Sequence, residues 1–123
     1  MPRVLIIEDD PDMRELERTA LECGGYDVRV ASNGQEGLKE VLEESPCVVL
    51  LDLMMPVMDG LTFLRELAKH TGTAEIPVVC VSAAGPEITA HALRLGAREV
   101  FHKPTDLDVL CDRVNHYCQR QDV

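Results

Sequence analysis

The sequence is poor in aromatic residues and lacks the long apolar segments of membrane proteins. It contains no Trp, and Phe, Tyr and Trp together make up 3% of the chain, so we expect none of the aromatic platforms that stack nucleic-acid bases. No apolar run approaches the roughly 20 residues of a membrane-spanning helix. The N-terminus also lacks the charged and apolar regions of a signal peptide. The sequence therefore predicts a cytoplasmic protein without a membrane span.

Positive charge is also scarce. Lys and Arg number 12 against 22 Asp and Glu, which gives a formal net charge of −10 at pH 7. A surface of this sign repels phosphate backbones and anionic lipids. We therefore expect this chain to bind neither nucleic acid nor membranes directly.

The cysteine pattern matches neither a zinc site nor a disulfide framework. There are five cysteines, an odd number, and no C-x-x-C pair. Cys47 and Cys80 lie in strand-like apolar runs, whereas Cys111 and Cys118 share one face of a predicted helix. Because free cysteine packs as a small hydrophobic residue, the sequence predicts reduced thiols that serve mainly in core packing.

The chain has enough apolar residues to build one core. Its 123 residues, 46% of them hydrophobic, fit a single domain over residues 1–123. Continuous apolar runs of the kind found in strands covered on both faces are Val4–Ile7, Cys47–Leu51 and Val78–Val81. Two less apolar runs, Asp27–Ala31 and Arg98–His102, predict strands at the edges of the sheet.

Segments with helical spacing of apolar residues separate these strands and follow the last one. We expect Pro11 at the first position of the first helix with Asp10 as its cap, and caps at Ser32 with Gln35 and at Thr105 with Asp108. The predicted apolar faces are Met13, Leu16, Ala20 and Leu21; Leu38, Val41 and Leu42; Leu61, Leu64, Leu67 and Ala68; Ile88, Ala92 and Leu95; and Leu107, Leu110, Cys111, Val114 and Tyr117.

Strand and helix thus alternate five times, which predicts a doubly wound α/β fold. The connections are short, and right-handed crossovers place helices on both faces of a parallel sheet. With the first, third and fourth strands central, the expected strand order is 2-1-3-4-5. In such a sheet, ligands bind beyond the carboxyl ends of the strands.

Acidic residues gather at those carboxyl ends. The first strand is followed by Glu8 and Asp9, and the third by Asp52. Neighbouring parallel strands lie about 4.8 Å apart, so we expect Asp9 and Asp52 to face each other across a gap that one cation could bridge. Carboxylates and waters are the ligands that Mg²⁺ prefers, and the backbone carbonyl of Met54 could supply another oxygen. The sequence therefore predicts a magnesium site.

A hydroxyl and an ammonium group follow the remaining strands. Ser82 ends the fourth strand and Lys103 follows the fifth, from where its side chain can reach Asp52. Phosphoryl transfer depends mainly on positioning and on stabilising the equatorial phosphoryl oxygens. These groups suit that task, with Asp52 as the nucleophile.

Four separated stretches resemble the receiver domains of response regulators, and the likeness extends over essentially the whole chain. They are Ile6–Pro11, Leu51–Gly60, Val81–Ala83 and Lys103–Pro104. The resemblance implies the flavodoxin-like receiver fold with a cis peptide bond before Pro104. It also implies that Asp52 is the phosphoacceptor, Glu8 and Asp9 are the acidic pair that serves Mg²⁺, Met54 is a backbone ligand, and Ser82 and Lys103 sense the phosphoryl group.

The same resemblance implies a signalling function. Members of the family take a phosphoryl group from a phosphohistidine on a sensor kinase or phosphotransfer protein and change conformation to control an output. Only self-directed phosphoryl transfer and slow autodephosphorylation are expected, so the chain would not be an enzyme. The family switch uses an aromatic residue three positions before the lysine, where this sequence has Val100. Phe101 should point to the opposite face, so we expect the output to use the loop after the fourth strand.

Three other functions fit the fold. An aspartyl-phosphate phosphohydrolase usually has a second acid two residues after the nucleophile, where this chain has Met54. A phosphorylation-independent adaptor would usually have lost the acceptor, the acidic pair or the lysine. A flavin carrier would need a phosphate-binding loop after the first strand, where Glu8 and Asp9 would repel phosphate.

Overall fold

Five parallel strands form one sheet in the order β2-β1-β3-β4-β5, as predicted. The computed structural model describes residues 1–70, 72 and 75–118. The strands are β1 (Arg3–Ile7), β2 (Asp27–Ala31), β3 (Val48–Leu51), β4 (Val78–Ser82) and β5 (Glu99–His102), and the helices are α1 (Pro11–Cys23), α2 (Gly34–Glu43), α3 (Gly60–Ala68), α4 (Pro86–Arg94) and α5 (Leu107–Cys118).

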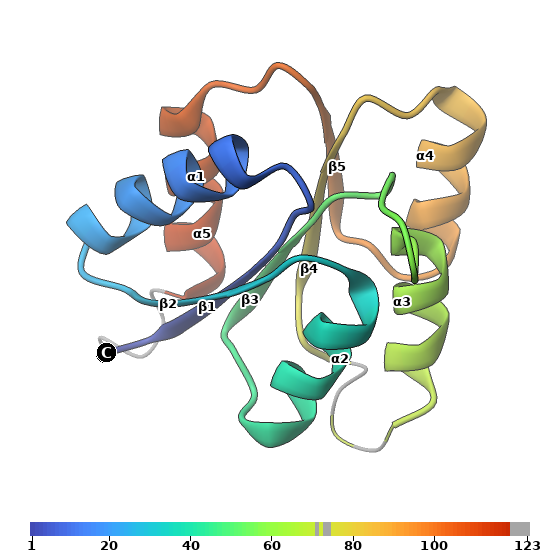
Figure 1. Cartoon of the computed structure of the whole chain (residues 1–123), viewed down its shortest axis with the longest axis horizontal. Helices are drawn as coiled ribbons and strands as arrows, with labels where there is room; N and C mark the ends of the chain where they lie inside the picture. Colours follow the sequence, from blue (N-terminus) through green and yellow to red (C-terminus); the bar gives the residue numbers. More distant parts are fainter. Residues whose placement is uncertain (71, 73–74, 119–123) are drawn as a thin grey trace.

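The helices cover both faces of the sheet. Helices α1 and α5 lie on one face, and α2, α3 and α4 lie on the other (Figure 1). Each face has its own apolar layer, because alternate residues of the central strands point to opposite sides. In β1, Leu5 and Ile7 belong to the layer under α2–α4, whereas Val4 and Ile6 belong to the layer under α1 and α5.

The first helix begins as expected, but two other predicted caps are shifted by one residue. Asp10 caps α1 by accepting a 3.0 Å hydrogen bond from the amide of Asp12. Helix α2 is capped by Asn33, not Ser32, and α5 begins after Asp106, whose side chain accepts from the Asp108 amide at 2.8 Å. The Ser32 hydroxyl donates instead to Glu36. Spacing alone could not separate neighbouring polar residues that are all good caps.

Two apolar residues assigned to buried helix faces are exposed. Leu16 on α1 is 55% exposed, and Leu42 on α2 is 49% exposed. On α1 the buried positions are Glu17 and Leu21, one helical turn apart. The buried side of α1 therefore includes position 17 and not position 16. The sequence analysis missed this because it counted only apolar residues, and residue 17 is a glutamate.

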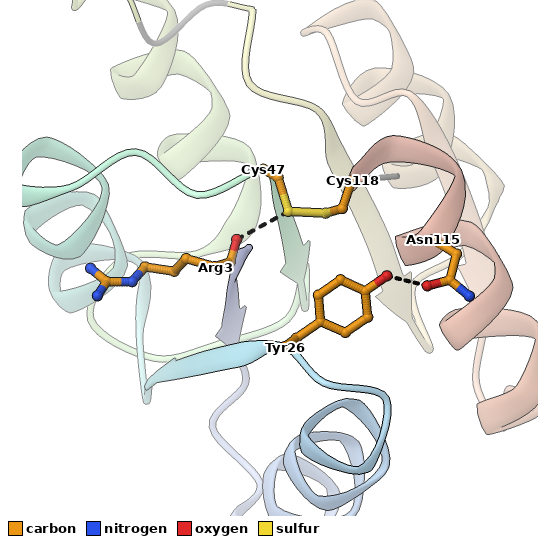
Figure 2. The surroundings of a disulfide bond; sticks show 5 residues. All are labelled: Arg3, Tyr26, Cys47, Asn115 and Cys118. Atoms are coloured by element: carbon orange, nitrogen blue, oxygen red, sulfur yellow. Dashed lines mark hydrogen bonds between the residues drawn. A yellow bond between two sulfur atoms is a disulfide. The ribbon is translucent and has the colours of Figure 1, made fainter. Parts of the chain in front are cut away.

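The prediction of five reduced cysteines is wrong for one pair. Cys47, just before β3, and Cys118, the last residue of α5, form a disulfide with their Cα atoms 5.3 Å apart (Figure 2). Cys23, Cys80 and Cys111 are free. The pair is separated by 71 residues in sequence, and only the packing of α5 on the sheet brings the two residues together. No local spacing could have indicated it.

The part of the chain that the structure describes contains no helix long and apolar enough to span a membrane.

Candidate functional site

The backbone ladder brings the acidic residues to one end of the sheet. The amide of Asp52 donates to the carbonyl of Ile7 at 3.0 Å, which extends the pairing of β1 and β3 by one residue. Asp52 therefore lies beside Glu8, the first residue after β1. In the same way the amide of Lys103 donates to the carbonyl of Ser82 at 3.0 Å, just beyond the β4–β5 pairing. All four residues thus meet at the carboxyl edge that the sequence predicted.

Three carboxylates form a compact cluster at this edge. Glu8, Asp9 and Asp52 each have a carboxylate oxygen within 4.8 Å of the others. Glu8 is 2% exposed and Asp52 is 5% exposed, whereas Asp9 lies on the surface. The donors are all hard oxygen atoms at separations that one small divalent cation could bridge, so the cluster fits Mg²⁺ better than a softer metal.

Lys103 provides the positive charge of the site. Its Nζ lies 2.8 Å from Oε1 of Glu8 and 3.5 Å from Oδ2 of Asp52. The peptide bond between Lys103 and Pro104 is cis, as the family resemblance implied. The sequence predicted that Lys103 reaches Asp52, and its closest partner in the structure is Glu8.

Ser82 ends β4 and Met54 lies in the loop after β3, at the same edge of the sheet as the cluster. Ser82 is fully buried, and its hydroxyl oxygen accepts a 3.1 Å hydrogen bond from the amide of Ala84. The amide of Met54 donates to Oδ1 of Asp52 at 3.1 Å, while the Met54 side chain is 54% exposed. The loop after β3 thus orients the Asp52 carboxylate through its backbone.

Burial sets the electrostatics of Glu8. Desolvation raises the pKa of Glu8 from 4.5 to about 7, opposed by the hydrogen bonds from Lys103 and from the Asp10 amide. Burial alone would lower the pKa of Lys103, but its hydrogen bond to Glu8 and the charge of Asp52 outweigh that effect and raise the pKa. The site thus holds excess negative charge that one ammonium group only partly balances, which favours binding of a further cation.

A third buried carboxylate, Glu17, was missed by the sequence analysis. It is 3% exposed on α1, and burial, followed by the charge of Glu8, raises the pKa of Glu17 from 4.5 to about 7. The available signal was its position four residues after Met13 and four before Leu21, which places it on the buried face of the helix.

Val100 and Phe101 point to opposite sides of β5, as expected from strand alternation. Val100 packs against the apolar layer that contains Leu53 and Met55. Phe101 packs against the layer that contains Val114 of α5. On the side of β5 that faces the layer under α4, the position three residues before Lys103 is therefore held by Val100, and the ring of Phe101 lies on the other side of the strand.

A family model places the chain among signal-transduction domains. The model described as "Response regulator receiver domain" matches residues 4–115. The fold and the positions of the acidic cluster agree with this match, and the chain belongs to the response regulator receiver family. It is a receiver domain of the phosphorylation-based two-component type.

Named relatives share the receiver but differ in length. The chain is 37% identical over 123 residues to the "DNA-binding dual master transcriptional regulator RpaA" of Synechocystis sp., covering 99% of this chain and 51% of that protein. It is 35% identical over 116 residues to "Protein PilH" of Pseudomonas aeruginosa, covering 94% and 96%. The chain thus spans about half the length of RpaA and nearly all of PilH.

Solved structures agree with the fold. The receiver domain of the Francisella response regulator 1452 superimposes with a TM-score of 0.88 at 32% identity, covering 98% of this chain and 99% of that chain. The receiver of a histidine kinase from Syntrophus aciditrophicus gives a TM-score of 0.88 at 28% identity, covering 98% and 92%. Receivers with this fold therefore occur both in response regulators and in sensor kinases.

Receiver domains are generally signalling domains without an enzymatic activity of their own. One relative, "Protein-glutamate methylesterase/protein-glutamine glutaminase 3" of Rhodospirillum rubrum, is named as an enzyme. It is 44% identical over 108 residues, and the match covers 85% of this chain and 28% of that protein.

Proposed function

We propose that Asp52 accepts a phosphoryl group from a phosphohistidine and that this modification switches the receiver. The observation that carries the proposal is the placement of the Asp52 carboxylate, 5% exposed, within 3.5 Å of Lys103 and inside the acidic cluster. The donor would be a sensor histidine kinase or a histidine phosphotransfer protein. Membership of the receiver family supports this donor class.

The transfer assigns a role to each residue. A carboxylate oxygen of Asp52 forms a bond to phosphorus as the phosphorus–nitrogen bond of the donor breaks, and the electron pair of that bond returns to the imidazole. The Lys103 ammonium group and the Ser82 hydroxyl stabilise the phosphoryl oxygens. The amide of Met54 keeps the carboxylate of Asp52 in place.

Glu8, Asp9, Asp52 and the backbone carbonyl of Met54 would hold Mg²⁺. The fit rests on three hard carboxylate donors within 4.8 Å of one another. Bound Mg²⁺ supplies positive charge that offsets the repulsion between these carboxylates and the incoming phosphoryl group. These four ligand residues would determine where the positive charge of Mg²⁺ lies relative to the acceptor carboxylate of Asp52.

We further propose that residues 1–123 form one receiver unit. This unit acts in the cytoplasm and binds neither nucleic acid nor membranes directly. Its only chemistry is its own phosphorylation and slow dephosphorylation. The net charge of −10 supports the expectation that the chain binds neither nucleic acid nor membranes directly. A hydrolase is less well supported, because Met54 stands where such an enzyme usually has a second acid.

Intact-mass measurement tests the assignment of Asp52. After incubation with Mg²⁺ and a small acyl-phosphate donor, the wild-type chain should gain one phosphoryl group, about 80 Da, and chelation of the metal should abolish the gain. Asp52→Asn should gain nothing, whereas Asp112→Asn, a change of an exposed acid on α5, should behave as wild type. Phosphorylation of Asp52→Asn to the wild-type level would refute the proposal.

A further inference from the structure

The disulfide lies at the end of the sheet opposite to the acidic cluster. Cys47 immediately precedes β3, and Asp52 immediately follows it, so one strand of about 16 Å separates the two sites. Cys118 ends α5. The bond therefore ties the last turn of α5 to the strand that carries Asp52, as Figure 2 shows for the cysteine pair.

Other contacts hold the same half of α5. Arg113 donates to Glu99 at the start of β5 at 2.8 Å, and the Tyr117 hydroxyl donates to the same carboxylate at 2.6 Å. Asn115 accepts a hydrogen bond from the hydroxyl of Tyr26, just before β2 (Figure 2). The helix would thus stay docked after reduction of the disulfide, and only its final turn would lose a constraint.

The reduced pair would also leave no buried polar group without a partner. Sγ of Cys47 lies 3.2 Å from the carbonyl oxygen of Arg3 (Figure 2), which is an acceptor for the thiol of the reduced form. Cys118 is 1% exposed and packs in the apolar layer with Val4 and Val48, where a thiol behaves as a small hydrophobic group. The same fold therefore suits both oxidation states.

From this arrangement we propose that Cys47 and Cys118 form a reversible redox switch. When oxidised, the pair fastens the end of α5 to the start of β3. When reduced, the last turn loses this covalent tie and opens more often, while the hydrogen bonds of Asn115 and Tyr117 keep the helix docked and the domain folded. The switch would give the receiver a second input, separate from Asp52 and independent of the proposed phosphorylation.

The oxidant is a low-molecular-weight disulfide of the glutathione type. The thiolate of Cys47, the half-buried member of the pair, attacks one sulfur of that disulfide, forms a mixed disulfide and releases one thiolate. The thiolate of Cys118 then attacks Sγ of Cys47, and the second small thiolate leaves. Two electrons pass to the small disulfide, and the two protons of the cysteine thiols end on the two small thiols.

The other three described cysteines are not part of this bond. Cys80 is fully buried in β4, and Cys111 lies two helical turns before Cys118. Cys23 is exposed at the end of α1. Cys111→Ser is therefore the matched control, because it removes a half-buried thiol from the same helix without touching the pair.

The test compares the full chain equilibrated with reduced glutathione and with glutathione disulfide. Peptide mapping should find one Cys47–Cys118 link in the oxidised sample, about 2 Da lighter than the reduced one, and its reversal on reduction. Circular dichroism and phosphorylation should be the same in both samples. Amide exchange at residues 115–118 should be at least about tenfold faster in the reduced sample.

The variants separate the switch from a structural bond. Cys47→Ser and Cys118→Ser should exchange like the reduced wild type under all conditions, while Cys111→Ser should respond as wild type. Failure to form the link, or equal exchange in both samples, would overturn the proposal. Unfolding on reduction would also overturn it, because the bond would then be a permanent structural one. None of these results depends on whether Asp52 is phosphorylated.

Discussion

Lys103 lies closer to Glu8 than to Asp52, at 2.8 Å against 3.5 Å. The two paired residues are 95 positions apart in sequence and follow β5 and β1, with β4 and β3 between these strands. The lysine side chain therefore crosses two strand ends to reach the more buried carboxylate. Its ammonium group lies between the carboxylates of Glu8 and Asp52 and forms an ion pair with each.

Replacing this lysine should change the titration of Glu8. In Lys103→Met the hydrogen bond that now lowers the pKa of Glu8 is lost, so the pKa should rise above its present value of about 7 and Glu8 should be mostly protonated at neutral pH. Carbon NMR of the Glu8 carboxyl group as a function of pH measures this directly. Lys69→Met, which removes an exposed ion pair with Glu66 on α3, should leave Glu8 unchanged. An identical Glu8 titration in Lys103→Met would show that the ion pair has little effect.

The buried Glu17 should make stability depend on pH. The fold raises its pKa from 4.5 to about 7, so between these values the folded chain binds more protons than the unfolded one. The free energy of unfolding should therefore fall as pH rises through this window. Glu17→Gln removes this contribution. As the pH rises from acidic to mildly alkaline, the free energy of unfolding of Glu17→Gln should therefore increase relative to that of wild type by on the order of 1–3 kcal/mol.

Urea unfolding at the two ends of this pH window measures the effect. Glu15→Gln is the matched control, because Glu15 lies on the same helix, is exposed, and forms only a surface pair with Arg18 at 3.6 Å. A pH dependence of Glu17→Gln equal to that of wild type would contradict the assignment.

Much of this fold and site could be predicted because the information is local. Continuous apolar runs predict central strands, and the residues that follow each run must meet at one edge of a parallel sheet, so Asp52 and Lys103 could be placed near each other. What could not be predicted depends on packing across distant segments. The preference of Lys103 for Glu8, the burial of Glu17 and the link between Cys47 and Cys118 arise only when helices dock on the sheet.

Gly60 is required by the close approach of α3 to the loop after β3. A Cβ atom at this position would lie 2.6 Å from Cα of Leu53 and 2.9 Å from the carbonyl oxygen of Asp52. Both are backbone atoms, so Gly60→Ala can be accommodated only by moving the segment that carries the acceptor. We expect a loss of about 1–3 kcal/mol in stability and phosphorylation by an acyl-phosphate donor slowed at least about tenfold.

Gly85→Ala is the control for this prediction. A Cβ atom at Gly85 meets nothing within 4 Å, and its φ of −77° is accessible to alanine. The phosphorylation rate should stay close to that of wild type, and urea unfolding should show only the loss of at most about 1 kcal/mol expected for alanine at the N-cap of α4. Equal rates for the Gly60 and Gly85 variants would mean that the approach of α3 does not constrain the site.

The neighbours Asp9 and Asp10 should have separable roles. Asp9 has a carboxylate oxygen within 4.8 Å of those of Glu8 and Asp52, whereas the Asp10 side chain accepts the Asp12 amide and caps α1. Asp9→Asn should weaken Mg²⁺ binding at least about tenfold with little change in stability. Asp10→Ala should cost about 1 kcal/mol of stability, and Asp10→Ser, which keeps a capping oxygen but no charge, should recover most of it. Calorimetric Mg²⁺ titration and urea unfolding of the three variants test the division. Loss of metal affinity in Asp10→Ser equal to that in Asp9→Asn would show that both acids serve the cation, because the serine variant differs from wild type mainly in charge.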